Sequence, residues 1–178
     1  MRHTLAGFGL AIIAASAFAG AQGPAEPPAS PGISLADISW KDAETALTES
    51  SVVVIPLGGA AVEHGPHLNL NSNERLARYL AGRVQAAAPV VIAPPLTYHF
   101  YPAFLEYPGS TTLSESTARD MTVDIVRSLA TSGPRRFYVL NTGRLTMPPL
   151  SAAAKTLAND GILLGYTDPV YRLAGADV

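Results

Sequence analysis

The chain has 178 residues, enough for one domain with a substantial core but too few for two comfortable ones. It carries 12 Lys and Arg against 14 Asp and Glu, and this balance excludes the basic surface that nucleic acid or an anionic membrane would require. There is no cysteine, so disulfides and thiolate metal ligands are also excluded. Any metal would have to be bound by His, Asp, Glu or carbonyl oxygen.

Residues 1–21 have the layout of a secretory signal peptide. A short basic start precedes an apolar run over 5–15, and the small residues suited to signal cleavage end at Ala19 or Ala21. The apolar run is short and interrupted by glycine, which favours cleavage over the alternative of a retained membrane anchor. We therefore expect a protein that is exported, to the periplasm or to the exterior.

Beyond the cleavage site, residues 22–32 indicate a disordered Pro- and Ala-rich tether, and residues 33–178 a single α/β domain. In that domain, short apolar runs rich in β-branched residues alternate with helical patterns. Strands are expected over 52–55, 89–93, 137–140 and 162–166, and helices over 42–47, after Asn73, after Glu115 and over 149–159. This alternation predicts a mainly parallel sheet with helices on both faces.

For two of these helices, the sequence predicts both the first residues and the buried face. Asn73 is a good N-cap for one helix, and Thr112 with Glu115 has capping-box spacing ahead of the other. Apolar residues three or four positions apart predict the buried faces. These are Leu76, Leu80 and Val84 on the first helix, and Ala118, Met121, Ile125 and Leu129 on the second.

The loop between the first long strand and the helix after it holds the main candidates for chemistry. Glu63, His64 and His67 lie there, where open α/β sheets bind ligands. A carboxylate beside imidazoles suits a divalent metal, although hydrogen-bonded loop residues would also explain the pattern. Gly65-Pro66 breaks the helix that an HExxH zinc motif needs, and the chain has no GxSxG elbow and no Walker loop.

Two further polar residues have both structural and functional interpretations. His99 belongs to an aromatic loop over 98–109, which would either wall a pocket or pack against a partner subunit, and packing is the simpler role for His99 itself. Asn141 comes at the end of a strand, where it would either bind substrate or cap the following turn.

The segment Pro56–Leu68, PLGGAAVEHGPHL, resembles the hallmark of the creatininase (creatinine amidohydrolase) family, in which a Glu and a His precede Gly-Pro-His-Leu. The similarity continues through Ala93–Tyr98, Tyr107–Thr111 and the strand end at Asn141, and covers roughly Ile33 to Tyr166. It implies a three-layer α/β/α sandwich that forms homo-oligomers. It also implies hydrolysis of a small creatinine-like amide by two divalent metals, zinc or manganese, which polarise the carbonyl and activate water.

Carried over residue by residue, the resemblance makes His64 a metal ligand and Glu63 the nearest match to a glutamate ligand, both of them catalytic. Asn73 falls on a bridging aspartate of the family and would be a third ligand, although its neutral amide cannot offset cationic charge as a carboxylate does. Residues that would contact the substrate are His67, Tyr98 and Asn141.

The chain departs from the family pattern at several ligand positions. Val62 stands where the Glu-x-His spacing has its glutamate, and the later histidine and glutamate ligands fall on Gly143 and Leu145. A His- and Glu-rich segment towards the family's C-terminus would lie beyond Val178. Three hypotheses follow: a metal-dependent amidohydrolase, a non-catalytic binding or scaffold protein with the same fold, or a fragment of a longer enzyme.

Overall fold

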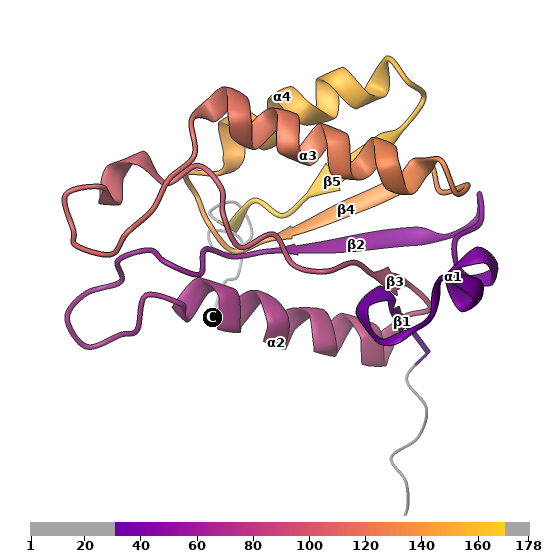
Figure 1. The fold of residues 1–178 in the computed structure, drawn as a ribbon, viewed down its shortest axis with the longest axis horizontal. Helices are drawn as coiled ribbons and strands as arrows, with labels where there is room; N and C mark the ends of the chain where they lie inside the picture. Colours follow the sequence, from indigo (N-terminus) through magenta and orange to yellow (C-terminus); the bar gives the residue numbers. More distant parts are fainter. Residues whose placement is uncertain (1–30, 170–178) are drawn as a thin grey trace, which may run out of the picture.

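The computed structural model describes residues 31–169, so the predicted signal peptide and most of the predicted tether lie outside the described residues. A single parallel sheet forms the centre of the domain, with strand order β1-β3-β2-β4-β5 (Figure 1). Its strands are β1 (Ile33–Ser34), β2 (Val52–Leu57), β3 (Val91–Ile92), β4 (Arg136–Asn141) and β5 (Leu163–Tyr166). Every pair of neighbouring strands is parallel, which confirms the predicted α/β class.

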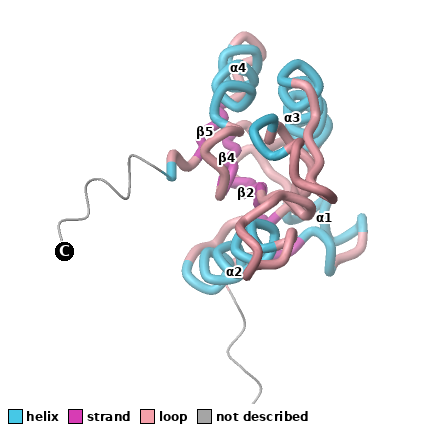
Figure 2. Tube along the Cα trace, turned by 90° about the vertical axis from the view of Figure 1, so that its left-hand side faces the viewer, coloured by secondary structure: helices cyan, strands magenta, loops and turns pink. Residues whose placement is uncertain are grey.

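Helices cover both faces of the sheet, as predicted. The described helices are η1 (Leu35–Asp37), α1 (Trp40–Ala46), α2 (Ser72–Ala87), η2 (Pro102–Phe104), α3 (Glu115–Ala130) and α4 (Met147–Ala158). Figure 2, which looks along the sheet, shows α3 and α4 on one side of the strands and α2 on the other. None of the helices within residues 31–169 is long and apolar enough to cross a membrane.

The core has two unequal parts because successive side chains of a strand point to opposite faces. Val53, Ile55 and Leu57 of β2 belong to the larger cluster, which also takes in side chains of α3 and α4. Val54 belongs to a smaller cluster with Ala81 of α2. A strand buried on both faces explains the unbroken apolar run in the sequence of β2.

The predicted start of α2 is wrong, and its predicted buried face is right only in part. The helix begins at Ser72, so Asn73 lies inside its first turn rather than at the N-cap. Its fully buried residues are Ala77 and Ala81, whereas Leu76 is 46% exposed. Val84 is partly buried against the smaller cluster, as predicted. A Cβ on Gly58 would overlap the backbone carbonyl of Asn73, so the helix lies very close to the strand end, and small side chains make the contact.

The start of α3 also differs from the prediction. Ser114 is the N-cap, and its hydroxyl accepts a hydrogen bond from the Thr117 amide at 3.1 Å. Thr112 instead accepts one from the Tyr101 amide at 2.8 Å, which ties the preceding loop to the helix start. The buried residues of α3 are Ala118, Thr122, Val123, Val126 and Ala130, while Met121, Ile125 and Leu129 are only partly buried. The buried face is rotated because α3 packs on α4 as well as on the sheet.

Two strands differ from their predicted lengths. β2 continues through Pro56 to Leu57, although Pro56 was expected to end it. Proline lacks an N–H, but the Pro56 carbonyl still accepts a hydrogen bond from the Leu96 amide at 2.8 Å. β3 is only two residues long, shorter than the predicted 89–93, because the chain turns away at Pro94.

Candidate functional site

The carboxyl ends of β2 and β4 meet at the centre of the sheet, where Leu57 pairs with Asn141. After β2 the chain passes to α2 on one face, and after β4 it passes to α4 on the other (Figure 1). Such a point, where successive connections leave to opposite faces, is the usual ligand crevice of an open α/β sheet. The Thr142 hydroxyl donates to the Leu57 carbonyl at 2.9 Å and holds the two strand ends together.

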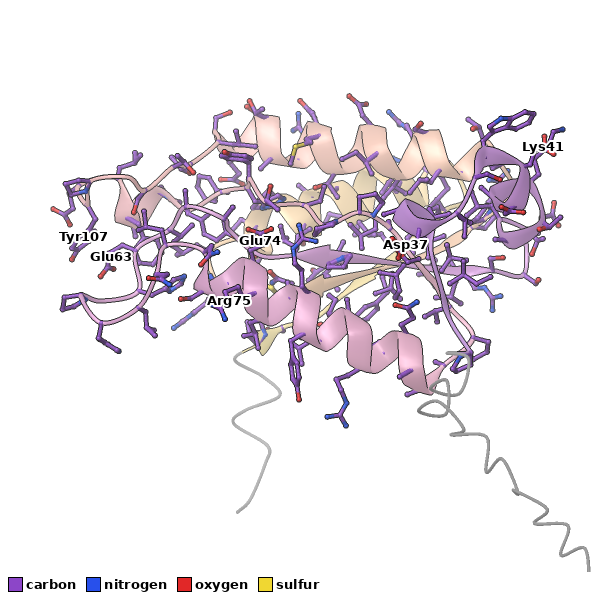
Figure 3. All side chains as sticks on the ribbon, turned by 60° about the horizontal axis from the view of Figure 1, so that its bottom comes forward. Asp37, Lys41, Glu63, Glu74, Arg75 and Tyr107 are labelled. Carbon is purple, nitrogen blue, oxygen red and sulfur yellow. The ribbon has the colours of Figure 1, made fainter. Side chains whose placement is uncertain are left out.

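The loop that carries the candidate residues is fastened to the aromatic loop. The Thr111 amide donates to the Ala61 carbonyl at 2.8 Å, and the Glu63 amide donates to the Ser110 hydroxyl oxygen at 3.0 Å. The two loops extend together from one end of the molecule, where Figure 3 labels Glu63 and Tyr107, opposite the end with Lys41. The resembling segments at 56–68 and 107–111 are therefore neighbours in space.

Glu63 and His64 lie side by side in the chain but have different surroundings. The Glu63 carboxylate accepts a hydrogen bond from the Gly65 amide, so it folds back on its own loop, and Gly65 has a φ of +86° that allows this turn. The Nε2 atom of His64 is buried and has no hydrogen-bond partner among the described residues. His67 is exposed.

Asn141 is buried and engaged on both sides of its amide. Its Oδ1 accepts hydrogen bonds from the Thr146 hydroxyl at 2.7 Å and the Gly143 amide at 3.0 Å. Its Nδ2 donates to the carbonyls of Gly143 at 2.8 Å and Thr167 at 3.2 Å. Asn141 therefore caps the turn after β4, and contact with a substrate stays a prediction.

The remaining candidates lie at different depths. Tyr98 is 53% exposed, Asn73 is half-buried in the first turn of α2, and His99 is fully buried. The Nε2 atom of His99 lies 3.3 Å from the Thr122 hydroxyl of α3, and burial lowers the pKa of His99 to about 4. His99 is thus a neutral packed residue at neutral pH.

Tyr101 is the residue at this site that sequence reasoning missed. It is 2% exposed and lies against Gly59, just after β2, and Gly143, just after β4. Burial raises the pKa of its hydroxyl to about 12, so it stays protonated. The signal available in the sequence was a glycine following each of two strands together with an aromatic loop nearby.

The donor set does not fit a two-metal centre. Within residues 31–169 no three His, Asp or Glu side chains come together in a group that could hold a metal ion. His64 contributes one imidazole, and the carboxylate of Glu63 is bound to its own loop. Val62, Gly143 and Leu145 have no side-chain donor to contribute.

The fold, with candidate residues on loops beyond the ends of the central strands, defines an α/β protein whose sheet switch point lies where such sheets bind ligands. Residues 36–174 match the family model described as creatinine amidohydrolase. The chain belongs to the creatininase family, whose members are metal-dependent amidohydrolases.

Two curated relatives agree with this assignment. The chain is 26% identical over 117 residues to the creatinine amidohydrolase of Pseudomonas putida, a match that covers 63% of this chain and 45% of that protein. It is 30% identical over 121 residues to the mycofactocin precursor peptide peptidase of Mycolicibacterium smegmatis, covering 65% and 48%. The matched part of this chain therefore spans about half the length of either relative.

Solved creatininase structures have the same fold. A manganese form superposes with a TM-score of 0.68 at 21% identity, covering 82% of this chain and 61% of that one. A mutant creatininase of Zn–Zn type gives the same TM-score, identity and coverage. Divalent metals are thus present in these neighbours.

Proposed function

We propose that this chain is a non-catalytic creatininase-fold protein, which keeps the family's fold and loop but does not by itself hydrolyse amides with two metals. The supporting observation is the donor set around the crevice, in which His64 is the one imidazole at a ligand position of the family. Its role would be to bind a partner or to act as a scaffold.

Charge and ligand number explain why this donor set favours binding over hydrolysis. A catalytic zinc ordinarily has three protein ligands and an open position, and a two-metal site needs more. The amide of Asn73 is neutral where a bridging carboxylate would balance two cations. The apolar side chains of Val62 and Leu145 supply neither charge nor lone pairs.

Metal content tests this proposal directly. The purified chain is incubated with zinc or manganese, freed of excess ion and measured by elemental mass spectrometry, beside His64→Ala and the exposed-residue control His67→Ala. We expect well below one equivalent of metal in all three, and no hydrolysis of creatinine or short linear amides. Near-stoichiometric metal that disappears only in His64→Ala, together with amide hydrolysis, would overturn the proposal.

A second candidate is a metal-dependent amidohydrolase acting on a creatinine-like amide. It is favoured by the buried His64 Nε2 atom, which has no partner within residues 31–169 and is of the kind that binds zinc. The other ligands would then come from outside the described residues or from a partner subunit, as in a fragment of a longer enzyme. In this case His67, Tyr98 and Asn141 would contact the substrate.

We further propose that the protein is exported and assembles as a homo-oligomer. Export is supported by the signal-like layout of residues 1–21, and assembly by the exposed apolar side chains of the aromatic loop. Leu105 is 59% exposed and Tyr107 is 44% exposed. Exposed apolar side chains of this kind would be covered in an interface between subunits.

A further inference from the structure

Tyr101 enters the space between the ends of β2 and β4. It comes from the loop after β3, and its backbone amide donates to the Thr112 hydroxyl at 2.8 Å, which fixes the position of the loop. The side chain is 2% exposed, so the ring is enclosed by protein rather than lying at a mouth open to water.

Two glycines make room for this ring. A Cβ added at Gly59 would lie 3.1 Å from Cε2 of Tyr101, and a Cβ added at Gly143 would lie 3.0 Å from Cε1. One ring edge thus faces the end of β2 and the other faces the end of β4. Any side chain at either glycine would compete with the ring for the same space.

The residues beside the two glycines leave little room around the ring. Val62 is 1% exposed, and its side chain would overlap a Cβ on Gly59. On the side of β4, the methyl group of Thr146 would lie 3.3 Å from a Cβ on Gly143. The ring and Val62 are therefore both buried beside Gly59, and the ring occupies the space between the two strand ends.

The hydroxyl of Tyr101 does not give this position a catalytic group. Oη makes no hydrogen bond of normal geometry within residues 31–169. Burial raises the pKa of the hydroxyl, and the nearby Gly59 backbone amide opposes this rise. A neutral phenol that keeps its proton supplies neither a general base nor a charged ligand. Its contribution here is the volume of its ring.

We propose that Tyr101 plugs the ligand crevice of this fold, and that removing its ring opens a site at the ends of β2 and β4 for a flat, uncharged aromatic molecule of the size of phenol. The proposal stands on the packing of Tyr101 between Gly59 and Gly143. It does not require the proposed function, since metal content and phenol binding are separate measurements.

Phenol is the probe for the first test. Tyr101→Ala should unfold at a lower temperature than the wild type and regain several degrees on addition of millimolar phenol, because a ligand that binds only the folded state stabilises it. Tyr101→Phe keeps the ring and loses only an unpaired hydroxyl, so it should resemble the wild type and not respond to phenol. No phenol-dependent shift in Tyr101→Ala would overturn the proposal.

The second test measures competition between the ring and a side chain at Gly143. Gly143→Ala should lower the melting temperature by about 3 °C or more where the ring is present, in the wild type and in Tyr101→Phe. In Tyr101→Leu the same change should cost much less. Gly82→Ala is the matched control, since a Cβ there meets no atom within 4 Å, and its effect should not depend on residue 101.

The second test remains informative if the variant used in the first test does not fold. If Tyr101→Ala does not fold, Tyr101→Leu still reports on the competition with residue 143 through the coupling between the two substitutions. An equal cost of Gly143→Ala in all three backgrounds would contradict the plug. If the wild type binds near-stoichiometric metal through His64 and hydrolyses amides, while Gly143→Ala still costs much less in Tyr101→Leu, the proposed function is rejected and the plug stays in place.

Discussion

Four buried side-chain atoms within residues 31–169 have no hydrogen-bond partner, and all of them lie in the two loops at the carboxyl end of the sheet. They are His64 Nε2, Asn71 Oδ1, His99 Nδ1 and Tyr101 Oη. Buried polar atoms without partners are uncommon in folded proteins because each loses its contacts with water. Their concentration at one end of the molecule marks a region that is less well stabilised than the rest, which is typical of a binding site.

His99 makes stability depend on pH. Its pKa is about 4 in the folded chain against 6.5 when solvated, so the unfolded chain binds the proton more tightly. The stabilisation is fully present above pH 6.5 and is lost as pH falls towards 4, by about 3 kcal/mol in total.

Urea unfolding between pH 7.5 and pH 4 measures this loss. His99→Gln should remove most of the pH dependence, since glutamine does not titrate, whereas the exposed-residue control His67→Gln should keep it. An unchanged loss of stability in His99→Gln would show that other groups are responsible.

At the scale of elements, the position of α2 depends on small side chains that let the helix lie close to the end of β2. Ala77 and Ala81 form the buried face of α2, and Gly58 receives the backbone of its first turn. Larger side chains at these positions would push the helix away from the sheet. Leu76 and Leu80, which the helical pattern placed in the core, flank this contact instead.

Ser114 should matter more to α3 than its exposed position suggests. Its hydroxyl caps the Thr117 amide, so Ser114→Ala should lower the free energy of unfolding by about 1 kcal/mol, measured by urea denaturation. Ser128→Ala is the control, because this exposed serine lies on the same helix and its side chain is not at a cap. Equal effects of the two substitutions would show that the cap does not stabilise the helix.

At the scale of the whole molecule, the described domain is an asymmetric sandwich. Two long helices cover one face of the sheet and one covers the other (Figure 2). On the side of α2, Leu163 of the edge strand β5 is 66% exposed. The larger core consequently lies between the sheet and the pair α3–α4, and most of the buried apolar residues belong to it.

If the protein is exported, the mature chain should have the mass expected after removal of the signal peptide. When the protein is expressed with its first residues in a bacterium that has a periplasm, the periplasmic product should lack residues 1–19 or 1–21, as shown by intact mass spectrometry. Ala19→Leu affects both predicted cleavage sites and should leave the signal attached, whereas Phe18→Leu should still be processed. A full-length mass in the wild type would favour a retained anchor.

Much of this protein was predictable from its sequence. The alternation of apolar β-branched runs with helical patterns predicted the parallel α/β sheet, and the segment around Glu63 and His64 indicated both the loop and the family. The buried face of α2 was predicted only in part, because a helical pattern records which residues are apolar and not how closely the helix approaches the sheet. Tyr101 was missed because its role depends on Gly59 and Gly143, which are 84 residues apart in the chain.

The sequence by itself determined the alternation of strands and helices from β2 to β5, although not the short strand β1, and the position of the candidate loop. It also determined that Val62, Gly143 and Leu145 have no side-chain metal donor. These features follow from local patterns and residue chemistry. Only the tertiary structure decided what occupies the crevice. Filling a space between two strand ends depends on contacts among distant segments, and no local pattern records those contacts. The ring of Tyr101 lies between the two glycines because the sheet places the ends of β2 and β4 next to each other.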